Sequence, residues 1–253
     1  MGLLTRDEAP VYELLQEAGE SPFLLTADHA GRLIPRALGD LGVSPADMER
    51  HIAWDIGIAG VTRRLSAALR ATAILQTYSR LVIDCNRQPD VASAMPQVSE
   101  ETLILGNMGL DEAARAARRQ AIFDPYHEAI AGMIARRART VYVAMHSFTP
   151  CFKGDVRQMQ VAVLYNCNPR LSLIVADLLQ AEAGLVVAQN APYRVSDETD
   201  YGVPVHAERK GLDYLELEIR QDLIADEDGQ AVWAARLARL LPLALHRLDT
   251  EAA

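Results

Sequence analysis

The segment 140–150, TVYVAMHSFTP, constrains the fold more than any other part of this chain. Residues 141–145 are apolar, β-branched or aromatic, which is typical of a buried strand, and Pro150 ends that strand soon after His146. In open α/β sheets, ligands bind at the carboxyl ends of the strands. His146 is therefore expected to lie where such a sheet binds its ligand.

Similar strand-like runs alternate with helical patterns along the rest of the chain. Further strands are expected at 23–27, 72–78, 81–83, 160–165, 185–188 and 214–219, and helices at 45–70, 111–139 (kinked or restarted at Pro125), 169–183 and 230–248. In the lead-in before residue 20, Tyr12, Leu14 and Leu15 are expected to form a short helix. The alternation predicts one α/β domain over residues 1–253, a three-layer α/β/α sandwich with a mixed, largely parallel sheet.

Two long polar segments interrupt this pattern, at 88–110 and 189–211. Loops of this length inside a compact domain are usually functional. We therefore expect both to contribute to a binding pocket.

Composition excludes several classes of function. The 253 residues are 50% hydrophobic, enough for a full core, and no apolar run of about 18 residues predicts a membrane span. The net charge is −9 with dispersed basic residues, which argues against nucleic-acid binding. The three cysteines are scattered and the N-terminus lacks a secretory pattern, so a cytoplasmic location is expected.

Two histidines follow expected strands and suggest a metal site. His29 follows the strand at 23–27 much as His146 follows that at 141–145. Either alone is more often a satisfied core residue, but the pair predicts one divalent cation, most simply zinc, with three protein ligands. Asp55, between Trp54 and Ile56, is the first choice for the third ligand. His51, one helical turn earlier, could orient or replace Asp55, and Asp28 is a further alternative.

An acid in the last strand is the candidate general base. Glu218 lies between Leu217 and Ile219, and a carboxylate in apolar surroundings near a metal can take a proton from water. Glu216 shares its face, so one of the two acids is expected to be a solvated edge residue. An ion pair between Glu218 and Arg220 or another arginine is the structural alternative.

Basic and amide residues near the expected strand at 81–83 suggest a small anionic substrate. Asn86 and Arg87 can hold a carboxylate, Arg80 can assist, and Asp84 is expected to brace an arginine. A structural ion-pair cluster is the alternative. The loop residues expected to complete the pocket are Asn190, Tyr193, Arg194 and His206, whereas His127 is expected to be a buried helix histidine.

Five ordered motifs in residues 21–225 together resemble the N-formylglutamate amidohydrolase family. They are Asp28-His29-Ala30-Gly31, His51-Ile52-Ala53-Trp54-Asp55, the segment 79–87 (SRLVIDCNR), His146-Ser147-Phe148-Thr149-Pro150 and the segment 218–223 (EIRQDL). The resemblance implies a mixed eight-stranded α/β/α fold like that of zinc carboxypeptidases, which are phosphorylase/hydrolase-like, and of aspartoacylases. It also implies roles for three motifs: Asn86-Arg87 as the carboxylate clamp, His146 as the later zinc ligand and Glu218 as the catalytic glutamate.

The first metal motif departs from the carboxypeptidase pattern His-x-x-Glu. His29 is followed by Ala30-Gly31-Arg32, so Asp55 has to complete the site from elsewhere in the chain. With this set, the resemblance implies a zinc amidohydrolase that deformylates an acidic amino acid such as N-formyl-L-glutamate, with a role in histidine breakdown. In this scheme Arg80 meets the side-chain carboxylate or stabilises the oxyanion.

Two other hypotheses remain open on sequence alone. One is a metal carboxypeptidase or another N-acyl amino acid deacylase, which differs in the size of its pocket. The other is a non-catalytic protein that binds small carboxylates. Oligomeric state and the native metal are not indicated by any pattern in the chain.

Overall fold

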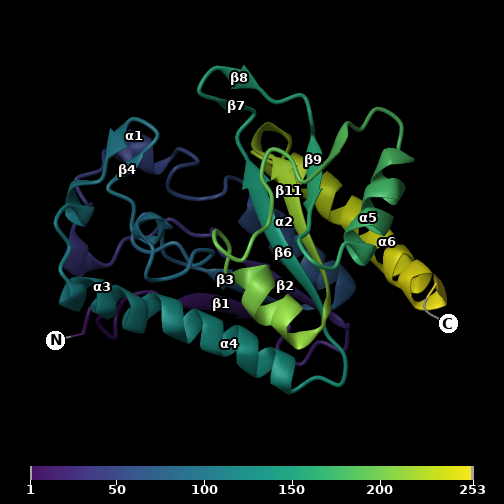
Figure 1. Cartoon of the computed structure of the whole chain (residues 1–253), viewed down its shortest axis with the longest axis horizontal. Coiled ribbons are helices and arrows are strands. Elements are labelled where there is room, and N and C mark those ends of the chain that lie inside the picture. The colour runs from purple at the N-terminus through teal and green to yellow at the C-terminus, as the bar shows by residue number, and fades with distance from the viewer. Residues whose placement is uncertain (1, 252–253) are drawn as a thin grey trace.

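A seven-stranded sheet forms the centre of the computed structural model, which describes residues 2–251 (Figure 1). The strand order is β1-β3-β2-β6-β11-β9-β10. The strands are β1 (Tyr12–Leu15), β2 (Phe23–Ala27), β3 (Thr72–Gln76), β6 (Val141–Phe148), β9 (Val161–Leu164), β10 (Val187–Gln189) and β11 (Asp213–Arg220). Two short hairpins lie outside the sheet, β4 (Val98–Ser99) with β5 (Thr102–Leu103), and β7 (Cys151–Phe152) with β8 (Asp155–Val156).

The sheet is mixed and largely parallel, as predicted. Strands β3, β2, β6 and β11 run parallel, β1 is antiparallel to β3, and β9 is antiparallel to β11 but parallel to β10. The described residues give this sheet seven strands rather than the eight implied by resemblance.

Helices cover both faces of the sheet. They are α1 (Pro45–Met48), α2 (Ile58–Leu69), α3 (Glu112–Arg118), α4 (Asp124–Ala135), α5 (Arg170–Gln180) and α6 (Glu227–Glu251). Val143 and Leu215 face a core shared with α2, α5 and α6, whereas Tyr142 and Tyr214 face a second core that includes α4. This alternation gives the predicted three-layer α/β/α sandwich. None of the described helices is both long and apolar enough to cross a bilayer.

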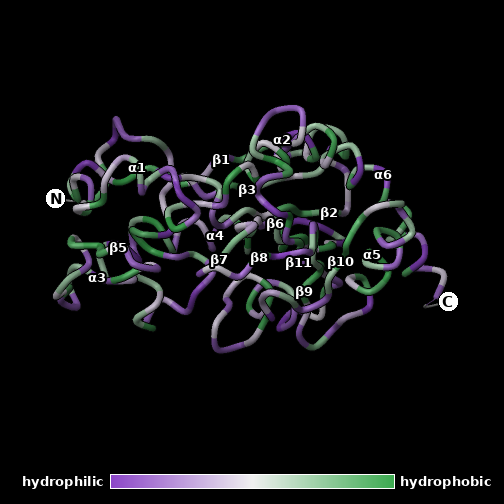
Figure 2. Tube along the Cα trace, turned by 90° about the horizontal axis from the view of Figure 1, so that it is seen from above, coloured by the Kyte–Doolittle hydropathy of each residue, from purple (hydrophilic) through white to green (hydrophobic). Residues whose placement is uncertain are grey.

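The parallel strands bring chemically active residues to one edge. In the register between β11 and β6, Glu218 lies beside His146. Thr26 of β2 lies beside Ala144 of β6, so the chain leaves β2 into Asp28 and His29 at the level of His146. Seen from above, α1, α3 and β5 gather at the end of the molecule away from α5 and α6 (Figure 2).

Three expected elements differ in the structure. Residues 12–15 form β1 rather than a helix, because their backbone pairs with β3 at the sheet edge. Residues 81–83 are buried but form a turn, because their side chains reach the α4 core without strand pairing. The helix expected at 45–70 is interrupted at 49–57 by turns, and α2 begins after Gly57, whose φ of 82° is left-handed.

The helix expected at 111–139 runs through α3, a π-helical stretch at Arg119–Phe123 and α4.

Candidate active site

A cavity of about 640 Å³ opens where β2, β6 and β11 end. The walls also include the first long loop, the β7–β8 hairpin and the second long loop. Of the sequence-predicted site residues, those that line it are His29, Asp55, Arg80, Asn86, Arg87, His146, Tyr193, Arg194 and Glu218.

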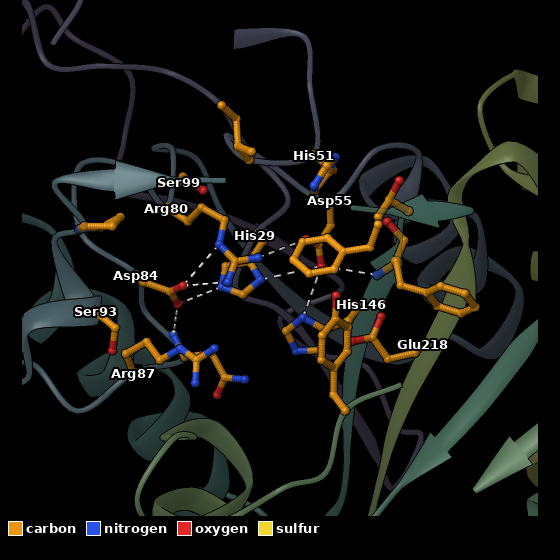
Figure 3. A pocket seen from close by; sticks show the side chains of 18 of the residues that line it. His29, His51, Asp55, Arg80, Asp84, Arg87, Ser93, Ser99, His146 and Glu218 are labelled. Carbon is orange, nitrogen blue, oxygen red and sulfur yellow. Dashed lines mark hydrogen bonds and ion pairs between the residues drawn. The ribbon is translucent and has the colours of Figure 1, made fainter. Parts of the chain in front are cut away.

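His29, Asp55 and His146 form a compact buried cluster in this cavity. One potential ligand atom from each lies within 4.8 Å of the others, and Asp55 lies between the two imidazoles (Figure 3). Asp55 Oδ2 lies 3.5 Å from His29 Nδ1 and 3.2 Å from His146 Nδ1. His29 Nδ1 has no hydrogen-bond partner among residues 2–251. Two imidazole nitrogens and a carboxylate oxygen are a donor set that suits zinc, so the residues fit a divalent cation.

The turn at 49–57 positions Asp55 for this cluster. The backbone N–H of Asp55 donates to the carbonyl of His29 at 2.9 Å. The backbone N–H of Ser147 donates to Asp55 Oδ2 at 3.1 Å. These bonds tie the turn to the ends of β2 and β6, so Asp55 reaches the site without being on a helix.

Each histidine meets a second carboxylate on the far side of its ring. Asp84 Oδ1 lies 2.7 Å from His29 Nε2, and Asp28 Oδ2 lies 3.7 Å from His146 Nε2. The hydroxyl of Tyr126 donates to the other Asp28 oxygen at 2.6 Å. Only the Asp84 contact is a hydrogen bond, since neither Asp28 Oδ2 nor His146 Nε2 has a partner among the described residues. An outer carboxylate such as Asp84 fixes the ring orientation of a metal-binding histidine and leaves the opposite nitrogen for the metal.

Burial and charge shift the acids in opposite directions. Burial raises the pKa of Asp55, but its contacts with His29 and His146 outweigh burial and hold that pKa below its ordinary value. Burial raises the pKa of Glu218 to about 8, and that of Glu216 likewise to about 8. Neither glutamate is the solvated edge residue that was expected, since both are buried and line the cavity. A carboxyl with a pKa in this range can exchange a proton near neutral pH.

The alternative ion pair between Glu218 and Arg220 does not form. The guanidinium of Arg220 instead binds Asp222 and the carbonyl oxygens of residues 157–159. Glu218 Oε2 has no hydrogen-bond partner among the described residues. Glu218 therefore keeps an oxygen with which it can act as a base in the cavity.

Arg80 is braced by two aspartates, as expected for Asp84. Its Nε and Nη2 donate to Asp84 Oδ2 at 3.1 and 2.7 Å, and its Nη1 lies 3.5 Å from Asp55 Oδ1. Most of its charge is thus matched within the site. Arg80 links the metal cluster to the outer carboxylate of His29.

Asn86 and Arg87 join the two long loops. Asn86 Oδ1 accepts the N–H groups of Tyr201 and Gly202 at 3.1 and 2.9 Å. Arg87 Nη1 donates to the carbonyl of Thr199 at 2.7 Å, and no acid lies within ion-pair distance of Arg87 among the described residues. Arg87 lines the cavity, and no described acid neutralises the charge of its guanidinium.

Comparison with known proteins identifies the family of the chain. Residues 21–225 match the family model described as N-formylglutamate amidohydrolase. The chain belongs to this family. No curated protein matches it.

The chain is similar to the crystal structure of gene product Atu2144 from Agrobacterium tumefaciens, with 38% identity, a TM-score of 0.93 and coverage of 98% of this chain and 99% of that one. An N-formylglutamate amidohydrolase from Ralstonia eutropha is 20% identical, with a TM-score of 0.67 and coverage of 94% and 98%. A bacteriophage poly-gamma-glutamate hydrolase is 11% identical, with a TM-score of 0.50 and coverage of 97% and 93%. The last two likenesses show the fold alone.

Asn190 and His206 were expected in the pocket, but neither is among the residues that line the cavity. Asn190 accepts the backbone N–H of Tyr165 at 2.9 Å, so its side chain holds the loop after β10. His206 lies 2.9 Å from His127, a buried helix histidine as predicted, on the α4 side of the sheet. His51 lines the cavity, but it lies in a turn and contacts Glu100 at 3.3 Å rather than Asp55.

The sequence interpretation missed Arg157, which is 7% exposed behind the aromatic wall of the cavity. It lies in the mostly polar segment 153–158 that follows Phe152. In such a segment the sequence does not distinguish a buried arginine from a solvent-exposed one. Nothing in the local pattern signals its burial, because the enclosing rings come from different segments.

Proposed function

We propose that this protein is a metal-dependent amidohydrolase that removes the formyl group from an acidic amino acid such as N-formyl-L-glutamate. The observation that carries the proposal is the cluster of His29, Asp55 and His146, in which His29 Nδ1 has no partner, beside a carboxyl that can act as a base. Membership of the N-formylglutamate amidohydrolase family supports the same reaction class.

His29, Asp55 and His146 would hold one divalent cation, which we propose to be zinc. A bound cation of this kind polarises the amide carbonyl and lowers the pKa of water. Asp84 would keep the imidazole of His29 oriented toward Asp55, whereas Asp28 Oδ2 lies 3.7 Å from His146 Nε2, beyond hydrogen-bond distance. The chain thus supplies both the ligands and the groups that orient them.

Glu218 would move the proton. Its unpaired oxygen accepts a proton from the attacking water and later delivers it to the leaving nitrogen. Burial raises the pKa of Glu218 to about 8, near the pH at which the carboxyl has to accept a proton and return it. The products would be formate and the free amino acid, which suits the proposed cytoplasmic role in histidine breakdown.

Asn86 and Arg87 would bind the α-carboxylate of the substrate. The amide of Asn86 is fixed by the backbone at 201–202, and Arg87 is fixed by Thr199. Arg80 Nη1, whose contact with Asp55 is long, would be the donor for the developing oxyanion. Each side chain is thus held by the scaffold before substrate arrives.

The test is turnover of N-formyl-L-glutamate by the purified protein, followed as formate and glutamate. Equal release of both products, abolished in Glu218→Gln, is the expected result. Dipeptides ending in glutamate and other N-acyl amino acids serve as comparison substrates. Cleavage of dipeptides alone would indicate a carboxypeptidase, and binding of glutarate without any turnover would indicate a carboxylate-binding protein; either contradicts the proposal.

A further inference from the structure

A buried arginine that the proposed mechanism does not use stands behind the cavity wall. The guanidinium of Arg157 lies 5.6 Å from the ring centre of Phe148, 5.3 Å from that of Phe152 and 5.1 Å from that of Tyr193. All three rings line the cavity. Arg157 itself is only 7% exposed.

No acid within residues 2–251 forms an ion pair with Arg157. Its Nη1 donates to the carbonyl of Thr149 at 3.3 Å and to the hydroxyl of Tyr193 at 3.1 Å. Its Nε and Nη2 donate to no described residue. Neither atom is fully buried, so both remain accessible to solvent or to a ligand. A buried cation without an anion is costly, and contacts with aromatic faces offset only part of that cost.

Arg157 is not itself among the residues that line the cavity, but it donates to the hydroxyl of Tyr193, which is, so its remaining donors lie beside the cavity wall and suit an anion bound there. The ring of Phe148, 5.6 Å from the guanidinium, lies at the end of β6, two residues after His146 and beside β11, which carries Glu218. Asn86 and Arg87 come from the other side, after the turn at 81–83. A substrate that spans the metal cluster with an anion at each end would meet both groups.

We propose that Arg157, held by Tyr193, binds the side-chain carboxylate of the substrate and makes the enzyme selective for N-acyl derivatives of acidic amino acids. The proposal rests on the proposed function and adds the residue that recognises the side chain of the substrate. Arg80 suits this role less well because Asp84 and Asp55 already match its charge. Lys153 and Arg194 also line the cavity, but both are exposed, where water and salt weaken their pull on an anion.

Paired substrates test this assignment. N-formyl-L-glutamate and N-formyl-L-glutamine have nearly the same shape and differ in the charge of the side chain. In Arg157→Gln, kcat/KM for N-formyl-L-glutamate should fall by about 100-fold, whereas that for N-formyl-L-glutamine should change by less than about threefold. Arg157→Lys, which keeps the charge but loses the planar fork, should lie between the wild type and Arg157→Gln.

Arg236→Gln is the matched control, because Arg236 also lies over an aromatic ring, that of Trp233, but pairs with Glu182 and is not among the residues that line the cavity. It should leave the ratio of kcat/KM between the two substrates as in the wild type. A parallel fall for both substrates in Arg157→Gln would overturn the proposal, since that result indicates a structural role or an effect on Glu218.

Binding of glutarate separates this proposal from the reaction itself. Calorimetry should show that Arg157→Gln binds glutarate no more tightly than it binds the monoamide, glutaramate. If the wild type hydrolyses neither formyl substrate, the proposed function fails, and the glutarate comparison still decides the role of Arg157. Unchanged glutarate affinity in Arg157→Gln would overturn that role.

Discussion

The carboxylate of Asp84 lies 2.7 Å from His29 Nε2, on the side of the imidazole opposite Asp55. Asp84→Asn keeps the shape but removes the charge that orients the ring. We expect metal affinity to fall by about 10- to 100-fold, measured by competition with a chromogenic chelator. Asp249→Asn, in an exposed pair with Arg139, is the control and should leave affinity unchanged. Equal affinities for Asp84→Asn and the wild type would show that Asp84 does not support the ligand.

Glu218→Gln should separate catalysis from metal binding. The amide cannot accept a proton from water, so kcat should fall by at least about 100-fold while the bound metal stays near the wild-type amount. Glu216→Gln is the matched change two residues earlier on the same strand face, and it should retain more activity. If Glu216→Gln is the more damaging of the two, the general base has been assigned to the wrong glutamate.

Removal of the proposed α-carboxylate clamp should act on substrate binding. Arg87→Gln loses a charge-assisted hydrogen bond, so KM for N-formyl-L-glutamate should rise by about 10-fold or more, with a smaller change in kcat. Arg63→Gln, in an exposed pair with Glu13, serves as the control. An unchanged KM in Arg87→Gln would place the α-carboxylate elsewhere.

The buried pair of His127 and His206 predicts a pH dependence of stability. The carbonyl of Cys85 can only accept, so His127 Nε2 donates to it and His127 Nδ1 accepts from His206 Nε2, 2.9 Å away. Burial lowers the pKa of His206 from 6.5 to about 4. Between these pH values the unfolded chain takes up a proton that the folded chain does not.

The free energy of unfolding should therefore fall as pH decreases from about 6.5 to about 4, by up to about 3 kcal/mol from His206. Above pH 6.5 both states hold a neutral imidazole and the contribution vanishes. His206→Gln can still donate to His127 but cannot titrate, so its urea-unfolding curves should depend less on pH in this interval. An identical pH dependence in the variant and the wild type would contradict the assignment.

The sequence predicted the parts of the fold that depend on periodicity. The apolar run 141–145 and the segment 214–219, in which apolar residues alternate with Glu216 and Glu218, are both strands, as their patterns predicted. Residues 81–83 are equally apolar, yet they form a buried turn. Burial without strand pairing leaves the same local pattern, so the sequence cannot separate the two.

The candidate site was predictable where its residues follow strands, as His29 and His146 do. Asp55 was placed on a helix, but backbone bonds to His29 and Ser147 hold it in a turn. Arg157 gave no signal, because its burial depends on rings brought together from two distant segments, 148–152 and 193. Contacts of this kind arise only from tertiary packing.

The most direct test of metal dependence is the metal content of freshly purified protein, measured together with formate release before and after chelation. We predict about one equivalent of zinc per chain, loss of activity with a chelator, and recovery when zinc is restored. His146→Ala should lose both the metal and the activity. Full activity in metal-free protein, or in His146→Ala, would contradict the account.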